Sequence, residues 1–235
     1  MSIRKFAYAA ILVVASVFIL GSCSKDDDDD NEIDNYEYVD LGLPSGTLWA
    51  TCNVGASKPE EYGNYFAWGE TTSKSVYDWS SYKWCDNGSE YKINKYCTYE
   101  MYGTIDNKSE LETEDDVATV NWGRKWRMPS LDQIKELINA ANTTVVWTTK
   151  NGVYGRLITS KKNSNSIFLP AAGYRAGSDN DFTGEGLYGF YWYRFLSSSD
   201  SNNALILLFG SPPSLELLGI PRCYGASVRP VRLEK

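Results

Sequence analysis

Two groups of aromatic side chains are the first candidates for chemistry in this sequence. The first group lies in a segment that also carries Ser, Asp and Lys, and comprises Tyr77, Trp79, Tyr82 and Trp84. The second follows a glycine-rich segment and comprises Tyr188, Tyr191, Trp192, Tyr193 and Arg194. An aromatic face can stack on the C–H face of a sugar while Asp, Asn and Arg side chains hydrogen-bond its hydroxyls. Ligand sites combine apolar area with a few placed polar groups in this way, so both groups are candidate ligand-binding residues.

The alternative for both aromatic groups is ordinary packing, because Tyr and Trp in a β-rich domain mostly fill the core and pair across strands. Alternation along a strand places Tyr191 and Tyr193 on one face and Trp192 and Arg194 on the other. We therefore expect one of these two sets to be buried.

Oxygen-bearing side chains at alternate positions give one weak signal for calcium. Residues 179–185 read Asp-Asn-Asp-Phe-Thr-Gly-Glu, so the possible ligands are Asp179, Asp181, Thr183 and Glu185, with a glycine at the sixth position. Calcium loops have this pattern, but their twelfth residue is a bidentate glutamate and here it is Phe190. A polar turn is the favoured interpretation. The sequence therefore predicts no cofactor, with calcium as the alternative.

The chain contains no histidine. A Ser-His-Asp triad, a Cys-His dyad and a histidine-ligated zinc site are therefore excluded. No GxSxG or phosphate-binding loop pattern is present either. Carboxylates are plentiful, but nothing in the sequence positions two of them as a glycosidase pair. These observations predict a protein that is not an enzyme.

Four cysteines follow Cys23 in the sequence: Cys52, Cys85, Cys97 and Cys223. In an oxidising compartment four cysteines suggest two disulfides, with three possible pairings. We favour Cys85–Cys97, which would close one loop, and Cys52–Cys223, which would tie the first strand region to the last. The alternative is four reduced, buried thiols.

The N-terminus carries the layout of a lipoprotein signal peptide. Arg4 and Lys5 precede an uncharged apolar run that ends at residue 20, and Leu-Gly-Ser-Cys then reads as a lipobox with Cys23 as the acylated residue. Five aspartates at 26–30 follow, and adjacent carboxylates repel one another and stay solvated. Residues 1–22 are thus the expected signal peptide and 23–35 an acidic tether. The cysteine followed by an acidic run resembles the surface-export signal of Bacteroidetes-type lipoproteins, which implies an outer-membrane protein that faces the medium.

The remaining residues, 36–235, suit one domain with a full core. Loss of Arg4 and Lys5 with the signal peptide changes the formal charge from -7 to -9. An acidic surface argues against nucleic acid as a partner, and the membrane is expected to be contacted only through the lipid anchor.

Local patterns predict an α+β domain of short antiparallel strands with long loops. The main helix is expected at 130–142, where Ser130 and Gln133 form a capping box and apolar residues recur at helical spacing. A shorter helix is expected at 114–121, and residues 71–110 are expected to be loops. Predicted strands lie at 36–43, 47–54, 62–68, 145–148, 154–160, 167–171, 188–196, 204–209 and 227–233.

Several longer motifs together resemble one family. They are VDLGLPSGTLWATCNVGA (39–56), YGNYFAWGE (62–70), EDDVATVNWG (114–123), WRMPSLDQIKELI (126–138), IFLPAAGYRAG (167–177) and GASVRPVR (225–232). Their succession is similar to the Fibrobacter major paralogous domain family of bacterial surface lipoproteins. That family is related to the C-type lectin-like fold of the formylglycine-generating, sulfatase-modifying enzymes, in which the first and last strands pair.

The resemblance does not carry the enzyme activity with it. The formylglycine-generating enzymes bind copper through two nearby cysteines close to the C-terminal region, whereas this chain has only Cys223 there. The resemblance instead implies non-enzymatic recognition of a glycan or a surface protein, as in adhesion. A structural role as a tip or accessory subunit of a surface appendage is the first alternative, and an enzyme is the least favoured.

Overall fold

The computed structural model describes residues 36–177, 182–211 and 214–233. The expected signal peptide, Cys23 and the acidic tether lie outside the described residues, as do Asp179 and Asp181 of the candidate calcium loop.

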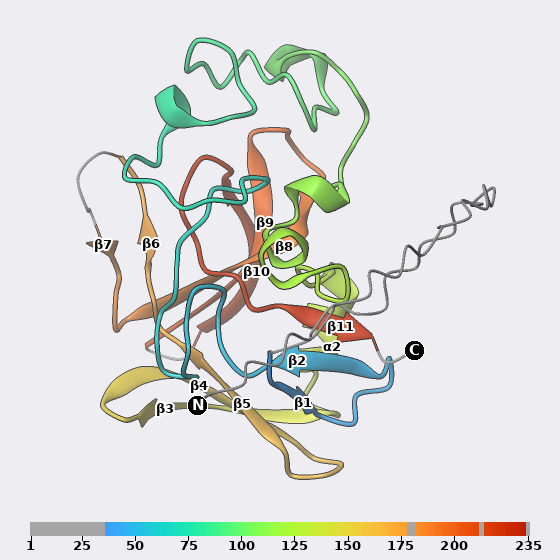
Figure 1. Ribbon diagram of the computed structural model, residues 1–235, viewed down its shortest axis with the longest axis vertical. Coiled ribbons are helices and arrows are strands. Elements are labelled where there is room, and N and C mark those ends of the chain that lie inside the picture. Colours follow the sequence, from blue (N-terminus) through green and yellow to red (C-terminus); the bar gives the residue numbers. More distant parts are fainter. Residues whose placement is uncertain (1–35, 178–181, 212–213, 234–235) are drawn as a thin grey trace, which may run out of the picture. The chain divides into compact units, whose positions relative to one another are not determined.

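The first and last strands of the described chain share one small antiparallel sheet (Figure 1). It contains β1 (Tyr38–Asp40), β2 (Thr47–Ala50) and β11 (Val231–Leu233) in the order β1-β2-β11. Trp49 in the middle strand pairs with Val39 on one side and Val231 on the other. The pairing of N- and C-terminal strands that the family resemblance implied is therefore present.

Two further three-stranded antiparallel sheets make up most of the strand content. One has the order β3-β4-β5 and comprises β3 (Thr143–Lys150), β4 (Val153–Ser160) and β5 (Ser166–Pro170). The other has the order β10-β9-β8 and comprises β8 (Tyr188–Leu196), β9 (Asn203–Gly210) and β10 (Ser214–Pro221). A two-stranded ribbon joins β6 (Tyr174–Arg175) to β7 (Phe182–Thr183). Figure 1 shows the β3-β4-β5 sheet and the long loops of residues 80–110 at opposite ends of the view.

The main helix, α2 (Leu131–Ile138), begins at the predicted residue. Its N-cap is Ser130, and the predicted capping box with Gln133 is confirmed. The helix ends four residues before the predicted Asn142. The chain turns at Asn139, which accepts from the Asn142 amide at 2.8 Å, and the Thr143 hydroxyl donates to the Leu137 carbonyl at 2.6 Å. Side chains and turns thus satisfy the last carbonyls in place of another helical turn.

The predicted shorter helix at 114–121 is divided into two pieces. A 3-10 turn, η3 (Thr113–Asp115), leads into α1 (Val117–Trp122). The carboxylate of Asp116 accepts from the Ala118 and Thr119 amides at 2.9 and 3.1 Å and caps α1. Two more 3-10 turns, η1 (Trp79–Ser81) and η2 (Glu100–Tyr102), lie in the predicted loop region 71–110.

The predicted strands need correction. The strand predicted at 47–54 ends at Ala50, the one predicted at 227–233 begins only at Val231, one predicted strand is absent and one strand was not predicted. Residues 62–68 do not form a strand: Gly63 has a φ of +73°, and the ladder contact of this segment is the bridge between Phe66 and Ala226. The strand β10 (Ser214–Pro221) was not predicted, because Gly219 and Pro221 are both poor strand formers. The described domain is accordingly mostly antiparallel β-sheet with few helices, which is compatible with an α+β class.

Three buried clusters form the core of the unit Ile33–Lys235. The first core cluster includes Trp68, Trp126 and Trp192, the second includes Trp49, Tyr191 and Phe209, and the third includes Tyr77, Tyr82 and Cys223. No helix among the described residues has the length and apolar character needed to cross a membrane.

Candidate functional site

The described surface contains an open pocket of about 610 Å³. Five separate stretches of the chain line it: Thr98–Tyr99, Ser109, Ser130–Asp132, Phe195–Ser198 and Leu205. The pocket is therefore built where the loop of residues 98–109 meets the start of α2 and the turn between β8 and β9.

The start of α2 forms one wall of the pocket, and its local sequence fixes it in place. The Ser130 hydroxyl accepts from the Gln133 amide at 3.2 Å, and the Gln133 side chain accepts from the Ser130 amide at 2.9 Å. These reciprocal bonds hold the first turn, so Leu131 and Asp132 have a defined position at the pocket edge. Asp132 is exposed and brings a carboxylate to the site.

Buried hydrogen bonds tie the loop wall to the β8–β9 turn. The hydroxyl of Ser201, which is fully buried, accepts from the amides of Thr98 and Tyr99 at 2.9 and 3.3 Å. The Tyr99 hydroxyl donates to the Ser198 carbonyl at 2.7 Å. The Leu196 amide donates to the Ser109 carbonyl at 2.8 Å. The two walls are thus joined directly, so the pocket is preformed rather than a gap between independent loops.

The pocket lining is rich in hydroxyls and carries one carboxylate. Its polar side chains are those of Thr98, Ser109, Ser130, Asp132, Ser197 and Ser198, and its rings are those of Tyr99 and Phe195. No lysine or arginine is among the lining residues, so the pocket lacks the positive charge that a phosphate or nucleic-acid ligand would require. Hydroxyls, one carboxylate and two aromatic rings suit a neutral ligand with many hydroxyl groups, such as a sugar.

The first predicted aromatic group lies outside this pocket, and two of its members belong to the core. Tyr77 and Tyr82 are 2% and 3% exposed, and their hydroxyls donate to the carbonyls of Tyr65 and Trp68 at 2.6 Å each. Their rings are enclosed by protein in this structure and offer no face to a ligand. Sequence spacing could not reveal this, because the segment has no periodicity that separates buried from exposed positions.

The two tryptophans of the first group are half-buried. Trp79 packs edge-on against Tyr82 with ring centroids 5.6 Å apart. The Trp84 indole donates to the Gly69 carbonyl at 2.8 Å, and the ammonium groups of Lys83 and Lys95 lie 4.1 and 4.8 Å from its ring centroid. Lysines thus already occupy the positions over the Trp84 ring where a sugar would stack.

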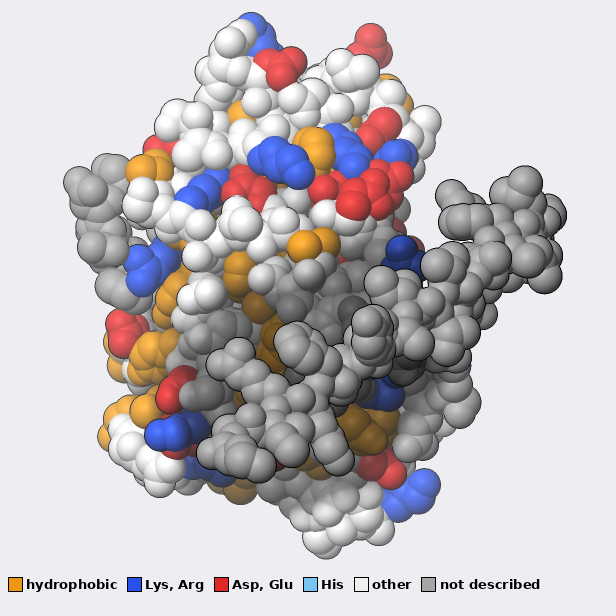
Figure 2. Space-filling view, viewed as in Figure 1, with side chains coloured by type: hydrophobic (Ala, Val, Ile, Leu, Met, Phe, Trp, Pro, Cys, Tyr) orange, Lys and Arg blue, Asp and Glu red, His pale blue; other side chains and the backbone are white. Residues whose placement is uncertain are grey.

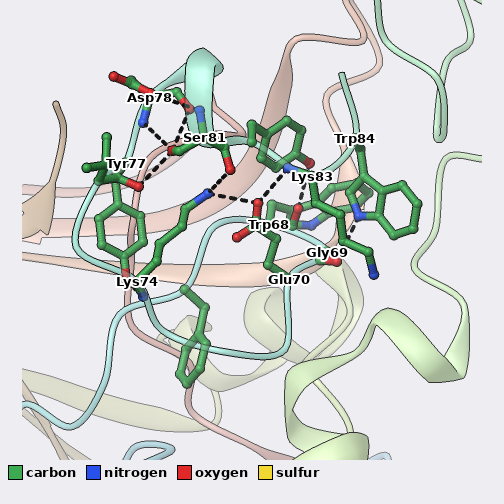
Figure 3. A network of polar contacts seen from close by, with 12 residues as sticks. Trp68, Gly69, Glu70, Lys74, Tyr77, Asp78, Ser81, Lys83 and Trp84 are labelled. Carbon is green, nitrogen blue, oxygen red and sulfur yellow. Dashed lines mark hydrogen bonds and ion pairs between the residues drawn. The ribbon is translucent and has the colours of Figure 1, made fainter. Parts of the chain in front are cut away.

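A buried carboxylate, that of Glu70, binds several groups of the same loop (Figure 3). Glu70 is 7% exposed and accepts from the Lys83 amide at 2.8 Å and from the Lys74 ammonium at 2.9 Å. Lys74 also donates to the Ser81 carbonyl at 2.9 Å. The Lys74 and Lys83 partners of the Glu70 carboxylate both belong to the loop, so this network holds the loop against the core.

The second predicted aromatic group is divided between the core and the surface. Tyr191, Trp192 and Tyr193 are at most 2% exposed. The set formed by Tyr191 and Tyr193 is buried, as expected, and Trp192 on the other face is buried as well. The reason is that β8 lies between two core clusters: Trp192 packs into the first, and Tyr191 and Tyr193 pack into the second. Only Tyr188, at 38%, has a substantially exposed ring in this group.

Arg194, the polar member of the second group, is held in an ion pair. Its guanidinium donates to the Glu110 carboxylate at 2.5 Å and to the Met128 carbonyl at 3.3 Å. Arg194 does not line the pocket, but the next two residues of β8, Phe195 and Leu196, do. The ion pair of Arg194 therefore helps to hold this pocket wall in position.

Three acidic side chains close together, Glu112, Glu114 and Asp115, form the one group among the described residues with metal-ligand spacing. Lysines surround them: Lys95 lies 2.6 Å from both Glu112 and Asp115, and Lys83 lies 3.4 Å from Asp115. Figure 2 shows acidic and basic side chains interleaved over the upper part of the view. Hydrogen bonds from Lys108 and Lys95 lower the pKa of Glu112 to about 2. The carboxylates are thus neutralised by ammonium groups, and the cluster is an ion-pair network.

The candidate calcium loop is described only in part. Thr183 pairs with Tyr174 in the β6–β7 ribbon, and Glu185 is exposed. Asp179 and Asp181 lie outside the described residues, so calcium binding there stays a prediction.

The four cysteines are free thiols in the structure, and all are buried. Neither predicted disulfide is formed. Cys52 packs in the first core cluster and Cys223 in the third. Cys85 and Cys97 share the third cluster, but their thiols donate to the carbonyls of Trp79 and Tyr99 at 3.1 and 3.3 Å. The structure therefore corresponds to the alternative of reduced, buried thiols.

The pocket residues were not among the sequence candidates. Phe195 directly follows the second aromatic group, and a run of three serines follows Leu196, but neither feature indicates a pocket by itself. No family model, curated protein or solved structure gives a significant match to this chain.

Proposed function

We propose that this protein is a non-enzymatic recognition domain that binds a glycan in the pocket between the 98–109 loop, α2 and the β8–β9 turn. The observation that carries the proposal is the lining: hydroxyls and one carboxylate beside the rings of Tyr99 and Phe195, with no basic side chain. Rings provide stacking area and the oxygens provide directional hydrogen bonds, which is the combination that sugar hydroxyls and C–H faces require.

We further propose that the domain is displayed on a cell surface as a lipoprotein of the Fibrobacter major paralogous domain family, with a C-type lectin-like fold. The lipobox at Cys23, the five aspartates that follow and the succession of family motifs support this proposal. The pairing of β2 with β11 agrees with the fold, in which the first and last strands are neighbours.

A glycan binding screen on the full chain tests the pocket. Phe195→Ala removes a ring and Asp132→Asn removes the charge of the one carboxylate, so each should weaken binding about tenfold or more. Trp79→Ala is the matched control, because Trp79 is a half-buried ring outside the pocket. Equal loss in Trp79→Ala and Phe195→Ala, or no sugar bound by the wild-type chain, would refute the pocket as a glycan site. Repeating the screen with a chelator tests the Asp179–Glu185 loop, because a chelator abolishes sugar binding only where that binding depends on calcium.

One surface favours the alternative of a protein partner or an accessory subunit. The loop that ends at the pocket exposes several large apolar side chains: Tyr91 (59%), Tyr99 (40%), Met101 (66%) and Ile105 (44%). Exposed apolar side chains gathered in one loop are typical of protein-binding surfaces. Retention of sugar binding by Met101→Ser, together with loss of assembly into a larger surface complex, would assign this loop to a protein partner.

A further inference from the structure

The strand β10 has an open edge. All eight of its residues pair with β9, and the sheet order β10-β9-β8 leaves its other side at the margin of the sheet. Within the described part of the chain, the backbone groups of residues 215–220 form no hydrogen bond except those to β9. The Ser214 carbonyl accepts from the Arg156 side chain at 3.2 Å. A row of backbone donors and acceptors is therefore available to another extended chain.

The opposite margin of the same sheet is covered. Isolated bridges join β8 to residues on three other segments, pairing Gly189 with Gly173, Tyr191 with Ser227 and Phe195 with Glu110. The strand β11 is likewise bridged on its outer side, between Val231 and Arg127. The open edge of β10 thus differs from the bridged margins at β8 and β11.

The side chains of β10 give this edge little protection. Leu217 is 36% exposed, Glu216 and Gly219 are exposed, and Leu215, Leu218 and Ile220 are half-buried. No lysine or arginine lies within the strand, and Glu216 is its one charge. Soluble proteins usually protect long apolar edges with charges, bulges or covering segments. An apolar, uncovered strand indicates a surface whose partner is itself a strand.

We propose that β10 pairs antiparallel with β10 of a second copy of this chain, so that two β8-β9-β10 sheets become one continuous sheet. Pairing about a two-fold axis at Leu217 places Leu217 opposite its own copy and Glu216 opposite Leu218. The most exposed leucine of the strand then contacts another leucine. The two glutamates face apolar residues rather than each other, so a second β10 suits this edge in charge as well as in hydrogen bonding.

The strand β3 provides a matched control. It is also the margin of a sheet, and Val146 on it is 54% exposed. Its sequence, TTVVWTTK, contains four threonines and ends in a lysine, which makes it a poorer partner for an apolar strand. A charge introduced at Val146 changes the surface as much as one at Leu217 but should leave the pairing of β10 untouched.

Sedimentation of the full chain over a wide concentration range tests the proposal. We expect a reversible dimer for the wild type and for Val146→Lys. Leu217→Lys places two ammonium groups opposite each other and should raise the dimer dissociation constant about tenfold or more. A wild-type chain that stays monomeric, or a dimer lost in Val146→Lys and kept in Leu217→Lys, would overturn the proposal. Circular dichroism of each variant separates loss of the dimer from loss of the fold.

A cross-linking variant tests the register independently of stability. Directly opposite residues in an antiparallel pair have Cα atoms about 4.5–5.5 Å apart, which suits a disulfide. Leu217→Cys should therefore give a covalent dimer on oxidation, whereas Val146→Cys should not. Equal cross-linking of both variants would show that the disulfides form by random collision between chains, and would contradict the proposed pairing. A monomer that captures an added extended peptide at β10 would assign the edge to a different partner, and would also refute the second copy.

Discussion

At the scale of single residues, two of the three buried arginines in the described chain, Arg222 and Arg229, each join several segments of the chain. The Arg222 guanidinium donates to the carbonyls of Tyr96, Ser201 and Lys95 at 2.8, 3.1 and 2.8 Å, and to the Tyr82 hydroxyl at 2.7 Å. Arg229 likewise donates to the carbonyls of Ala50, Thr51 and Phe168 and to the Asn53 side chain. A buried guanidinium has five donors and therefore satisfies several carbonyls at once, including those of loop residues such as Tyr96 and Ser201.

Replacing Arg222 by methionine should destabilise the protein severely. Methionine keeps much of the apolar volume but leaves three buried carbonyls without donors, and we expect a loss of about 3 kcal/mol or more in the free energy of unfolding. Urea denaturation measures this loss. Arg127→Met is the control, because Arg127 is exposed and should change stability by no more than about 0.5 kcal/mol. Similar midpoints for the two variants would show that the Arg222 network is not structural.

The buried thiol of Cys223 should make the protein sensitive to alkaline pH. Burial raises its pKa from 9.0 to about 12. The folded state therefore holds this proton more tightly than the unfolded state does, so stability is unaffected below pH 9 and falls as the pH rises from 9 towards 12. The slope from this one thiol is about 1.4 kcal/mol per pH unit. Thermal unfolding of wild type and Cys223→Ser across this range should show a shallower decline in the variant, and parallel curves would contradict the assignment.

At the scale of secondary-structure elements, the start of α2 combines a local sequence signal with a role in the pocket. Ser130→Ala removes the acceptor for the Gln133 amide and should cost about 1 kcal/mol of unfolding free energy. Ser198→Ala removes another hydroxyl from the pocket lining but no helix cap, so its stability should stay at the wild-type value. Urea midpoints distinguish the two, and an equal effect would mean that the cap contributes nothing.

Elements with strong local signals were predictable, and the others depended on distant contacts. The capping box fixed the start of α2, and alternating apolar residues located β8 to its exact ends. The segment 62–68 has the composition of a strand, but Tyr65, Phe66 and Trp68 pack into the core clusters without forming a ladder. The strand β10 pairs with β9 along its full length despite an internal glycine. Its strand conformation therefore depends on hydrogen bonds to β9 rather than on the strand propensity of its own residues.

The candidate pocket shows where prediction from local patterns ends. Its lining comes from stretches up to about a hundred residues apart, joined by bonds such as those from Thr98 and Tyr99 to Ser201. None of these stretches has a motif of its own. The aromatic residues that were conspicuous in the sequence turned out to be mostly core, because large rings supply the most buried area per residue. The pocket instead uses serines and a single phenylalanine that only the fold brings together.

At the scale of the whole domain, the C-terminal segment joins the three core clusters. Within ten residues, Cys223 packs in the third cluster, Ala226 and Val228 in the first, and Val231 in the second. The same segment pairs with β2 through Val231 and carries two of the three buried arginines among the described residues, Arg222 and Arg229. Side chains from one short segment therefore connect the loop region to the sheets, and the domain should unfold as one unit rather than cluster by cluster.

Truncation after Tyr224 tests this view of the domain. The truncated chain keeps every described helix and ten of the eleven described strands, but it loses Arg229 and β11. It also loses Ala226 and Val228 from the first cluster and Val231 from the second. We expect it to lose the cooperative thermal transition and the near-ultraviolet circular dichroism of its buried tryptophans. The single substitution Arg229→Met should retain a cooperative transition at a lower temperature, because the apolar contacts of the segment remain. A truncated chain that still melts cooperatively would show that the three core clusters do not need the C-terminal segment to connect them.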